Sequence, residues 1–308
     1  MNNPHDRFFK SLFSRKQEVI DFVKGVFPDK ILKRIDFNSF QADPNAYVDK
    51  RLQEHFSDFV YNCNYGSNLV KIALLFEHKS TKPPYPHFQL LQYILNIQEQ
   101  QIKQNKKPVP VIPVIIYHGV QNWNYIPMRK YFSGIDRDIE RFLPQFEYLL
   151  IDLSKYTLDE VKRFYHSIAL QMSLLVLKYI FRKNELKNLF FRIFEKLPEL
   201  LKDHDGRELY ISLLTYLYYG SDLEIGYVID NIQQISEQGG EIAMSTAEKL
   251  IQQGKLEGIQ EGMEKGMKKG IQKSKREVAQ RMIGEGFKDD IIAKITGLSQ
   301  EDIKKLRD

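Results

Sequence analysis

Three polar residues, Asp58, Glu77 and Lys79, form the part of the sequence best suited to chemistry. Asp58 lies in one strand-like run, and Glu77 and Lys79 follow a second run, residues 69–76, which is almost wholly apolar. Such a run predicts a strand that is buried on both faces. Glu77 and Lys79 are two residues apart, so a strand would point both to the same side. Because charges are costly to bury without a reason, the trio predicts a functional site.

The chemistry that suits these residue types is metal-assisted cleavage of a phosphodiester bond. The carboxylates of Asp58 and Glu77 offer the hard oxygen ligands that Mg²⁺ prefers. A bound metal ion lowers the pKa of a water molecule and offsets the charge that builds on the phosphate. The ammonium group of Lys79 can orient that water or stabilise the transition state. We therefore expect Mg²⁺ as the cofactor, or Mn²⁺ or Ca²⁺ in its place.

The elements that position the trio can be predicted from local patterns. A Gly-Ser-Asn turn at residues 66–68 predicts a hairpin, which would place Asp58 and Glu77 on neighbouring strands. The surrounding patterns predict helices at about 6–26 and 88–104, a strand within 110–119 and a first strand near 31–40. The resulting order is α-β-β-β-α-β.

Three further residues are candidates for supporting roles. Gln89 and Tyr93 lie four residues apart, so both face the same side of the predicted helix. Asp6 has two interpretations: it is an ordinary helix N-cap, or it contacts the metal. No cluster of His and Cys residues has zinc-site spacing, and the sequence lacks a glycine-rich phosphate loop with Lys-Ser/Thr, so a nucleotide cofactor is not expected.

Several motifs in the right order make the sequence resemble the recombination-promoting nuclease (Rpn) family, a PD-(D/E)XK nuclease family of transposase-like proteins. The resemblance covers nearly the whole chain. It is carried by the opening His-Asp-Arg-Phe-Phe-Lys at 5–10, by Ser-Asp at 57–58, by residues 75–80 and 115–119, and by the tail 286–306. It implies bacterial, metal-dependent proteins that cleave DNA and are linked to recombination or mobile elements.

The resemblance also implies roles for single residues. By analogy with the superfamily, the backbone carbonyl of His78 is a metal ligand beside Asp58 and Glu77. Gln89 and Tyr93 match the Q-x-x-x-Y pattern of the superfamily's exonuclease branch. Family members often carry Gln where this chain has Lys79, and lysine matches the wider superfamily better.

Composition sets looser limits. The chain has 308 residues and a formal net charge of +5, from 45 basic and 40 acidic residues. That balance is compatible with DNA binding without arguing for it. The single cysteine, Cys63, excludes a disulfide framework and fits a reducing cytoplasm. The most apolar stretch, residues 168–180, is too short to span a bilayer, so no membrane partner is expected.

We expect an α/β fold with a restriction-endonuclease-like PD-(D/E)XK core, a helical middle region and a helical C-terminal tail. The predicted domains are a catalytic domain at 1–155, a helical bundle at 156–246, and a stem with a helix-turn-helix-like tail at 247–308. The bundle is predicted from helix-spaced apolar residues such as Ile168, Met172 and Leu175.

Glycine recurs every four residues from Gly254 to Gly270. Each glycine costs about 1 kcal/mol of helix propensity relative to alanine, so a flexible linker is one interpretation. The other is a stem whose small residues let a second helix approach closely, as in a homodimer. The tail has helix-turn-helix spacing. A basic run precedes it and is expected to contact DNA phosphates; its residues are Lys265, Lys268, Lys269, Lys273, Lys275 and Arg276.

The sequence thus predicts a cytoplasmic, metal-dependent DNA endonuclease linked to recombination or mobile elements. The alternative is a catalytically inactive DNA- or protein-binding protein that retains the nuclease fold.

Overall fold

The computed structural model describes residues 4–43, 56–77 and 84–307, with the backbone alone at 56–58 and 73–77. Its contacts divide the chain into two compact units, Met1–Ala247 and Glu248–Asp308. The first unit is an α/β unit with one sheet and a mostly helical remainder, and the second is entirely helical in its described part.

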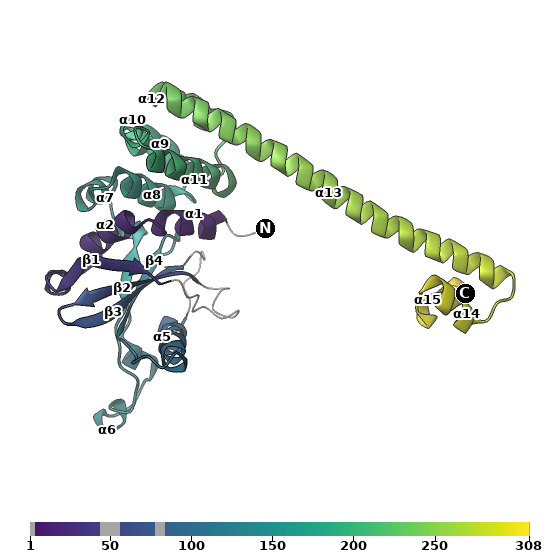
Figure 1. Cartoon of the computed structure of the whole chain (residues 1–308), viewed down its shortest axis with the longest axis horizontal. Coiled ribbons are helices and arrows are strands. Elements are labelled where there is room, and N and C mark those ends of the chain that lie inside the picture. Colours follow the sequence, from purple (N-terminus) through teal and green to yellow (C-terminus); the bar gives the residue numbers. More distant parts are fainter. Residues whose placement is uncertain (1–3, 44–55, 78–83, 308) are drawn as a thin grey trace. The chain divides into compact units, whose positions relative to one another are not determined.

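A five-stranded sheet forms the centre of the first unit (Figure 1). The strands lie side by side in sequence order: β1 (Ile35–Ala42), β2 (Phe56–Tyr65), β3 (Asn68–Glu77), β4 (Val111–Tyr117) and β5 (Leu149–Asp152). The first three strands pair antiparallel, and β3, β4 and β5 pair parallel. The β2–β3 turn contains Gly66 at φ +61°, a backbone conformation that glycine adopts without strain. This two-residue turn is the predicted hairpin.

Helices cover both faces of this sheet. The helices that precede and join the strands are α1 (Pro4–Phe13), α2 (Lys16–Val26), α3 (Asp29–Leu32), α5 (Pro86–Lys103), the short 3₁₀ helix η1 (Met128–Tyr131), α6 (Arg137–Glu140) and η2 (Leu153–Lys155). After the sheet come α7 (Leu158–Phe164), α8 (Ile168–Tyr179), α9 (Lys183–Phe194), α10 (Leu197–Leu200), α11 (His204–Gly220) and α12 (Ile225–Ile235). Among the described residues the elements follow the predicted order α-β-β-β-α-β, although the predicted first helix is divided into α1 and α2.

The two faces of the sheet belong to different apolar clusters. On one face, Ile72 and Ile116 pack in a large core with α1, α2 and the helices that follow η2. On the other face, Val60, Ile115 and Tyr117 pack in a smaller cluster with α5. The helical region after residue 155 thus shares the main core with the sheet, since alternate strand residues face it.

The second unit contains most of α13 (Glu237–Gly284), then α14 (Asp289–Thr296) and α15 (Gln300–Arg307). The helix α13 begins in the first unit, where Ala243 and Ala247 are buried. It is continuous through the five repeated glycines, so the structure has a helix rather than a flexible linker there. Residues 251–274 of this helix are all exposed. No helix among the described residues has the length and apolar character needed to cross a membrane.

Candidate active site

Asp58 lies on β2 and Glu77 on β3, and the antiparallel register of these two strands determines how far apart the two positions are. Asp58 pairs with Leu75, and Phe56 pairs with Glu77. Directly paired residues belong to the same face of a sheet, and faces alternate along each strand. Positions 58 and 77 therefore share one face as diagonal neighbours, for which a separation of about 7–8 Å is typical.

The face that holds positions 58 and 77 is the one that α5 covers. Val60, two residues after position 58, packs in the α5 cluster. Tyr117 of β4 pairs with Glu77 and is buried in the same cluster. Both acidic positions thus lie on the α5 face, at the edge where β3 and β4 end.

Gln89 and Tyr93 lie on the first turns of α5. Because β3 and β4 are parallel and α5 connects them, the helix runs back along the sheet and begins near the carboxyl ends of both strands. Tyr93 is buried in the α5 cluster. The Oε1 atom of Gln89 is buried, and no group in the described part of the chain hydrogen-bonds to it. A buried acceptor that has no hydrogen-bond partner among the described residues lowers the stability of the fold, so Gln89 is a less usual buried residue than Tyr93.

Asp6 lies in the first turn of α1, a helix whose buried residues pack on the opposite face of the sheet. The helix begins at Pro4, so Asp6 is not its N-cap; its Oδ2 atom pairs with Lys10 Nζ at 3.1 Å. The adjacent His5 ring lies 5.3 Å from the ring of His118, which directly follows β4. Asp6 is therefore near the same edge of the sheet as position 77.

The sequence did not indicate that His5 and His118 lie together in one cluster. His5 Nδ1 lies 2.7 Å from the Tyr216 hydroxyl of α11, and both histidine rings contact Phe181. His118 is buried, and its Nδ1 lies 3.2 Å from the Leu177 carbonyl oxygen. The only signal in the sequence was their presence in two of the motifs that carry the family resemblance.

The remaining members of the predicted site lie outside what the structure describes. This applies to Lys79 and His78 entirely, and to the side chains of Asp58 and Glu77. Among the side chains that are described, no group of three His, Cys, Asp or Glu residues is arranged to hold a metal. The ligand set Asp58, Glu77 and the His78 carbonyl, and the role of Lys79, stay predictions.

An aromatic cluster surrounds His87 at the start of α5. His87 is fully buried, and its Nδ1 lies 2.8 Å from the Tyr131 hydroxyl. Its ring lies 5.0 Å from Tyr148 and 5.4 Å from Phe146. Burial lowers the pKa of His87 from its usual range. Burial therefore favours the neutral form of the imidazole, which is surrounded by aromatic side chains.

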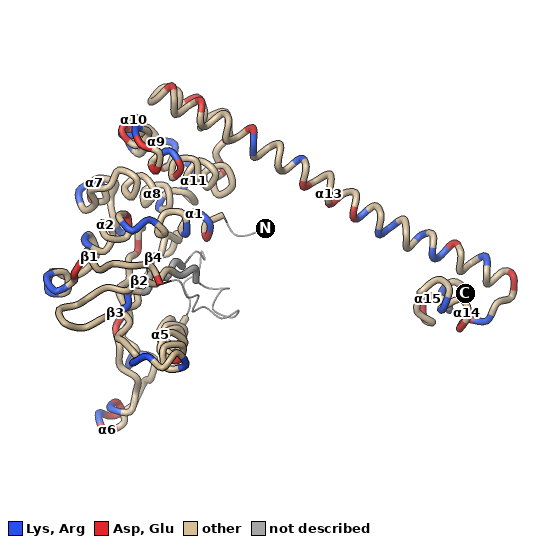
Figure 2. The backbone as a smooth tube through the Cα atoms, viewed as in Figure 1, with Lys and Arg blue, Asp and Glu red and all other residues tan. Residues whose placement is uncertain are grey.

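The basic run lies on α13, where Figure 2 shows positive residues concentrated toward the end of the helix. Two of its lysines form ion pairs within the helix, Lys265 with Glu261 at 3.1 Å and Lys273 with Glu277 at 3.9 Å. A groove of about 720 Å³ runs between this part of α13 and the end of α15. Its lining residues are Lys268, Lys269, Gln272, Lys273, Arg276, Glu277, Gln280 and Leu306.

The tail folds as helix, glycine turn, helix. Gly297 ends α14 at φ +66°, a conformation that suits glycine. The Ser299 hydroxyl accepts a hydrogen bond from the Asp302 backbone N–H at 3.1 Å, as an N-cap does. A small core of Ala279, Ile292, Leu298 and Ile303 holds both helices against the end of α13.

Two family models and two relatives match this chain, and the relatives match nearly all of its length. The family model described as "Putative transposase, YhgA-like" matches residues 3–208, and that of the "Rpn/YhgA-like nuclease family, C-terminal HTH domain" matches residues 272–308. Two proteins of Escherichia coli (strain K12) are each 24% identical to the chain: Inactive recombination-promoting nuclease-like protein RpnE, over 98% of this chain and 97% of that protein, and Recombination-promoting nuclease RpnA, over 98% and 96%. No solved structure matches the chain significantly.

Proposed function

Because this chain belongs to the YhgA-like transposase family, as its motifs predicted, we propose that it is a metal-dependent DNA endonuclease with a PD-(D/E)XK active site. The observation that supports this best is the β2–β3 register, which gives Asp58 and Glu77 diagonal positions on the α5 face. Two acids at the end of an apolar strand pair are suited to holding one divalent cation.

The donor set fits Mg²⁺, since carboxylate and carbonyl oxygens are the ligands that this ion favours. Asp58, Glu77 and the His78 carbonyl would hold it, and Mn²⁺ or Ca²⁺ would occupy the same ligands. When bound, the metal supplies an activated water and charge stabilisation on the phosphate. Lys79 would orient the attacking water. Gln89, whose Oε1 atom is buried without a hydrogen-bond partner among the described residues, would orient a ligand from α5, with Tyr93 beside it.

DNA contact outside the active site would come from the second unit. The match to a helix-turn-helix domain over residues 272–308 supports DNA as its partner. The exposed basic run of α13 would neutralise phosphates, which stabilises binding without reading the sequence. The exposed face of α13, with its glycines, would pair with a second copy of the chain, so that two active sites can act on two strands. We infer that the protein acts on DNA in the cytoplasm.

One observation favours a second candidate function. RpnE, named as inactive, is as similar to this chain as RpnA is, at 24% identity. A protein can therefore resemble this chain over nearly its whole length and still be named inactive. The alternative is a catalytically inactive DNA- or protein-binding protein that keeps the fold.

Nicking of supercoiled plasmid tests the proposal and separates the two candidates. The endonuclease should convert supercoiled plasmid to open circles in Mg²⁺ and leave it intact in EDTA. A Mn²⁺ titration by calorimetry should show one site that is lost in Asp58→Ala. DNA binding without nicking, and with no Mn²⁺ site, would support the inactive alternative.

A further inference from the structure

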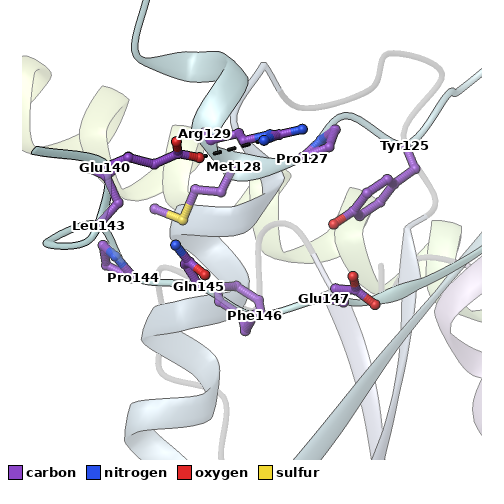
Figure 3. Close-up of a pocket in the computed structure, with 10 residues that line it drawn as sticks. All are labelled: Tyr125, Pro127, Met128, Arg129, Glu140, Leu143, Pro144, Gln145, Phe146 and Glu147. Atoms are coloured by element: carbon purple, nitrogen blue, oxygen red, sulfur yellow. Dashed lines mark ion pairs between the residues drawn. The ribbon is translucent and has the colours of Figure 1, made fainter. Parts of the chain in front are cut away.

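The segment between β4 and β5 forms a pocket of about 440 Å³ on the first unit (Figure 3). Its size lies within the range of about 300–1,000 Å³ that is typical of ligand sites. The pocket is bounded by residues on both sides of η1 and α6: Tyr125, Pro127, Met128, Arg129, Glu140, Leu143, Pro144, Gln145, Phe146 and Glu147. All of them belong to residues 118–148, a segment for which the proposed function has no role.

The walls of the pocket combine flat apolar surfaces with a few polar groups. Tyr125 and Phe146 supply aromatic rings, and Met128 supplies a polarisable thioether. In Figure 3, Tyr125 directs its hydroxyl toward the pocket interior, and the amide of Gln145 lies between Met128 and Phe146. An amide offers both a donor and an acceptor. This combination suits a planar heteroaromatic ring that stacks on one face and forms hydrogen bonds along its edge.

The pocket has no excess of positive charge, because its lining contains one basic residue, Arg129, and two acidic residues, Glu140 and Glu147. The segment 118–148 carries four basic and four acidic residues. Within the pocket, Arg129 is paired with Glu140, its Nη1 atom lying 3.6 Å from Oε1 (Figure 3). A surface that binds the phosphate backbone carries an excess of Lys and Arg. The ligand that fits this pocket is therefore an uncharged base rather than a phosphate.

Aromatic residues connect the pocket to the apolar cluster under α5, at the edge of the sheet that holds the candidate active site. Tyr117, the register partner of Glu77, lies 5.2 Å from the ring of Trp123. Two residues later, Tyr125 in the pocket wall lies 5.1 Å from Tyr148. Tyr148 in turn lies 5.0 Å from His87 at the start of α5. Tyr117, Trp123 and Tyr148 all pack in the α5 cluster, so the pocket wall and this edge of the sheet rest on one apolar cluster.

We propose that this pocket binds a nucleobase that has left the stack of the DNA next to the cleaved bond. The substrate class would then be DNA with a mismatch, a gap or another single-stranded element, since an unpaired base leaves the duplex most easily. Tyr125 and Phe146 would stack on the base, and the Gln145 amide would bond to its edge. This inference rests on the proposed function, which supplies DNA as the substrate and cleavage at the edge of the sheet.

A fluorescent base tests the proposal without any cleavage. A short duplex carries 2-aminopurine opposite a mismatched base, and the full chain is titrated into it in EDTA. Unstacking raises the fluorescence of this base, so the wild-type complex should be brighter than free DNA. Tyr125→Leu and Gln145→Ala should lose this rise. Each should also bind the mismatched duplex about tenfold more weakly, as expected for one lost stacking or edge contact, and bind the matched duplex as the wild type does.

Phe142→Ala is the matched control, because Phe142 is an aromatic residue of the same segment, 71% exposed and outside the pocket lining. It should keep both the fluorescence rise and the affinity. Gln145 is exposed, so Gln145→Ala gives a result even if Tyr125→Leu fails to fold. DNA binding with no fluorescence rise, or a rise that survives in both pocket variants, overturns this inference alone. A wild-type chain that binds neither duplex, and that also fails to nick plasmid in Mg²⁺, overturns the proposed function as well.

Discussion

Replacing Gln89 by methionine should make the protein more stable and less active. The Gln89 Oε1 atom is buried, and nothing in the described part of the chain hydrogen-bonds to it. A buried acceptor without a partner costs about 1–3 kcal/mol. Methionine has a similar length and no such acceptor, so Gln89→Met should recover at least about 1 kcal/mol of unfolding free energy. For a unit of this size, each kcal/mol raises the melting temperature by about 2–4 °C.

The same substitution should slow plasmid nicking by about 10–100-fold, the usual effect of losing a residue that orients a metal ligand. Stability gained together with activity lost is the signature of a group kept for function. Calorimetric melting and the nicking rate in Mg²⁺ measure the two effects on one preparation.

Gln101 on the same helix is the matched control. It is buried, but its Oε1 atom accepts a hydrogen bond from the Val109 N–H at 3.1 Å. Gln101→Met should therefore lower the melting temperature and leave the nicking rate of the folded protein unchanged. If Gln89→Met melts lower than wild type, or nicks plasmid at the wild-type rate, the reasoning about Gln89 is refuted.

Three further predictions concern other parts of the molecule. Lys71 forms an ion pair with Asp43 in which both side chains are at most 5% exposed, and the Asn62 amide hydrogen-bonds to both residues. Lys71→Met should therefore lose about 3–5 kcal/mol in urea unfolding. Adding Asp43→Leu should restore part of this loss, because the Asn62 amide then lacks both of these partners; an unaffected single variant would contradict this. Burial lowers the pKa of His87, so the unfolded chain binds more protons than the folded chain below about pH 6.5, and stability should decrease as the pH is lowered. His87→Gln should lose less stability than the wild type between about pH 7.5 and 5.5, and an equal loss would argue against the neutral imidazole. Lys268 and Lys269 are exposed, and each should contribute about 0.9 to the slope of log affinity for duplex DNA against log salt concentration. An unchanged slope in the Lys268→Gln/Lys269→Gln variant would show that these two lysines do not contact DNA.

Local patterns carried most of the information about the sheet and the candidate acids. The apolar run before Glu77 and the glycine turn at 66–67 predicted the β2–β3 hairpin, because strand burial and turn chemistry depend on adjacent residues. The four-residue spacing of Gln89 and Tyr93 likewise predicted one face of α5. These inferences use contacts close in the sequence, where periodicity is informative.

Features that depend on contacts between distant segments were not predictable in this way. His5 and His118 meet only because α1 packs beside the end of β4, and neither residue has a local pattern that indicates the other. The base-sized pocket is built from a segment with two short helices and no sustained periodicity. Helix propensity alone predicted that the glycine-rich part of α13 would be only marginally stable as a helix, yet this part is helical. Ion pairs four residues apart, such as Lys265 with Glu261, favour that helix without being decisive.

The most direct test of the central claim compares Asp58→Asn and Glu77→Gln with Glu99→Gln in the Mg²⁺-dependent nicking of plasmid. Glu99 is an exposed acid on α5, paired only loosely with Lys103 at 4.0 Å, so Glu99→Gln controls for the loss of one negative charge. All three variants should melt as cooperatively as the wild type. The two site variants should lose nicking, while Glu99→Gln keeps the wild-type rate. Nicking by Glu77→Gln near the wild-type rate would contradict the assignment of these two positions as the active site.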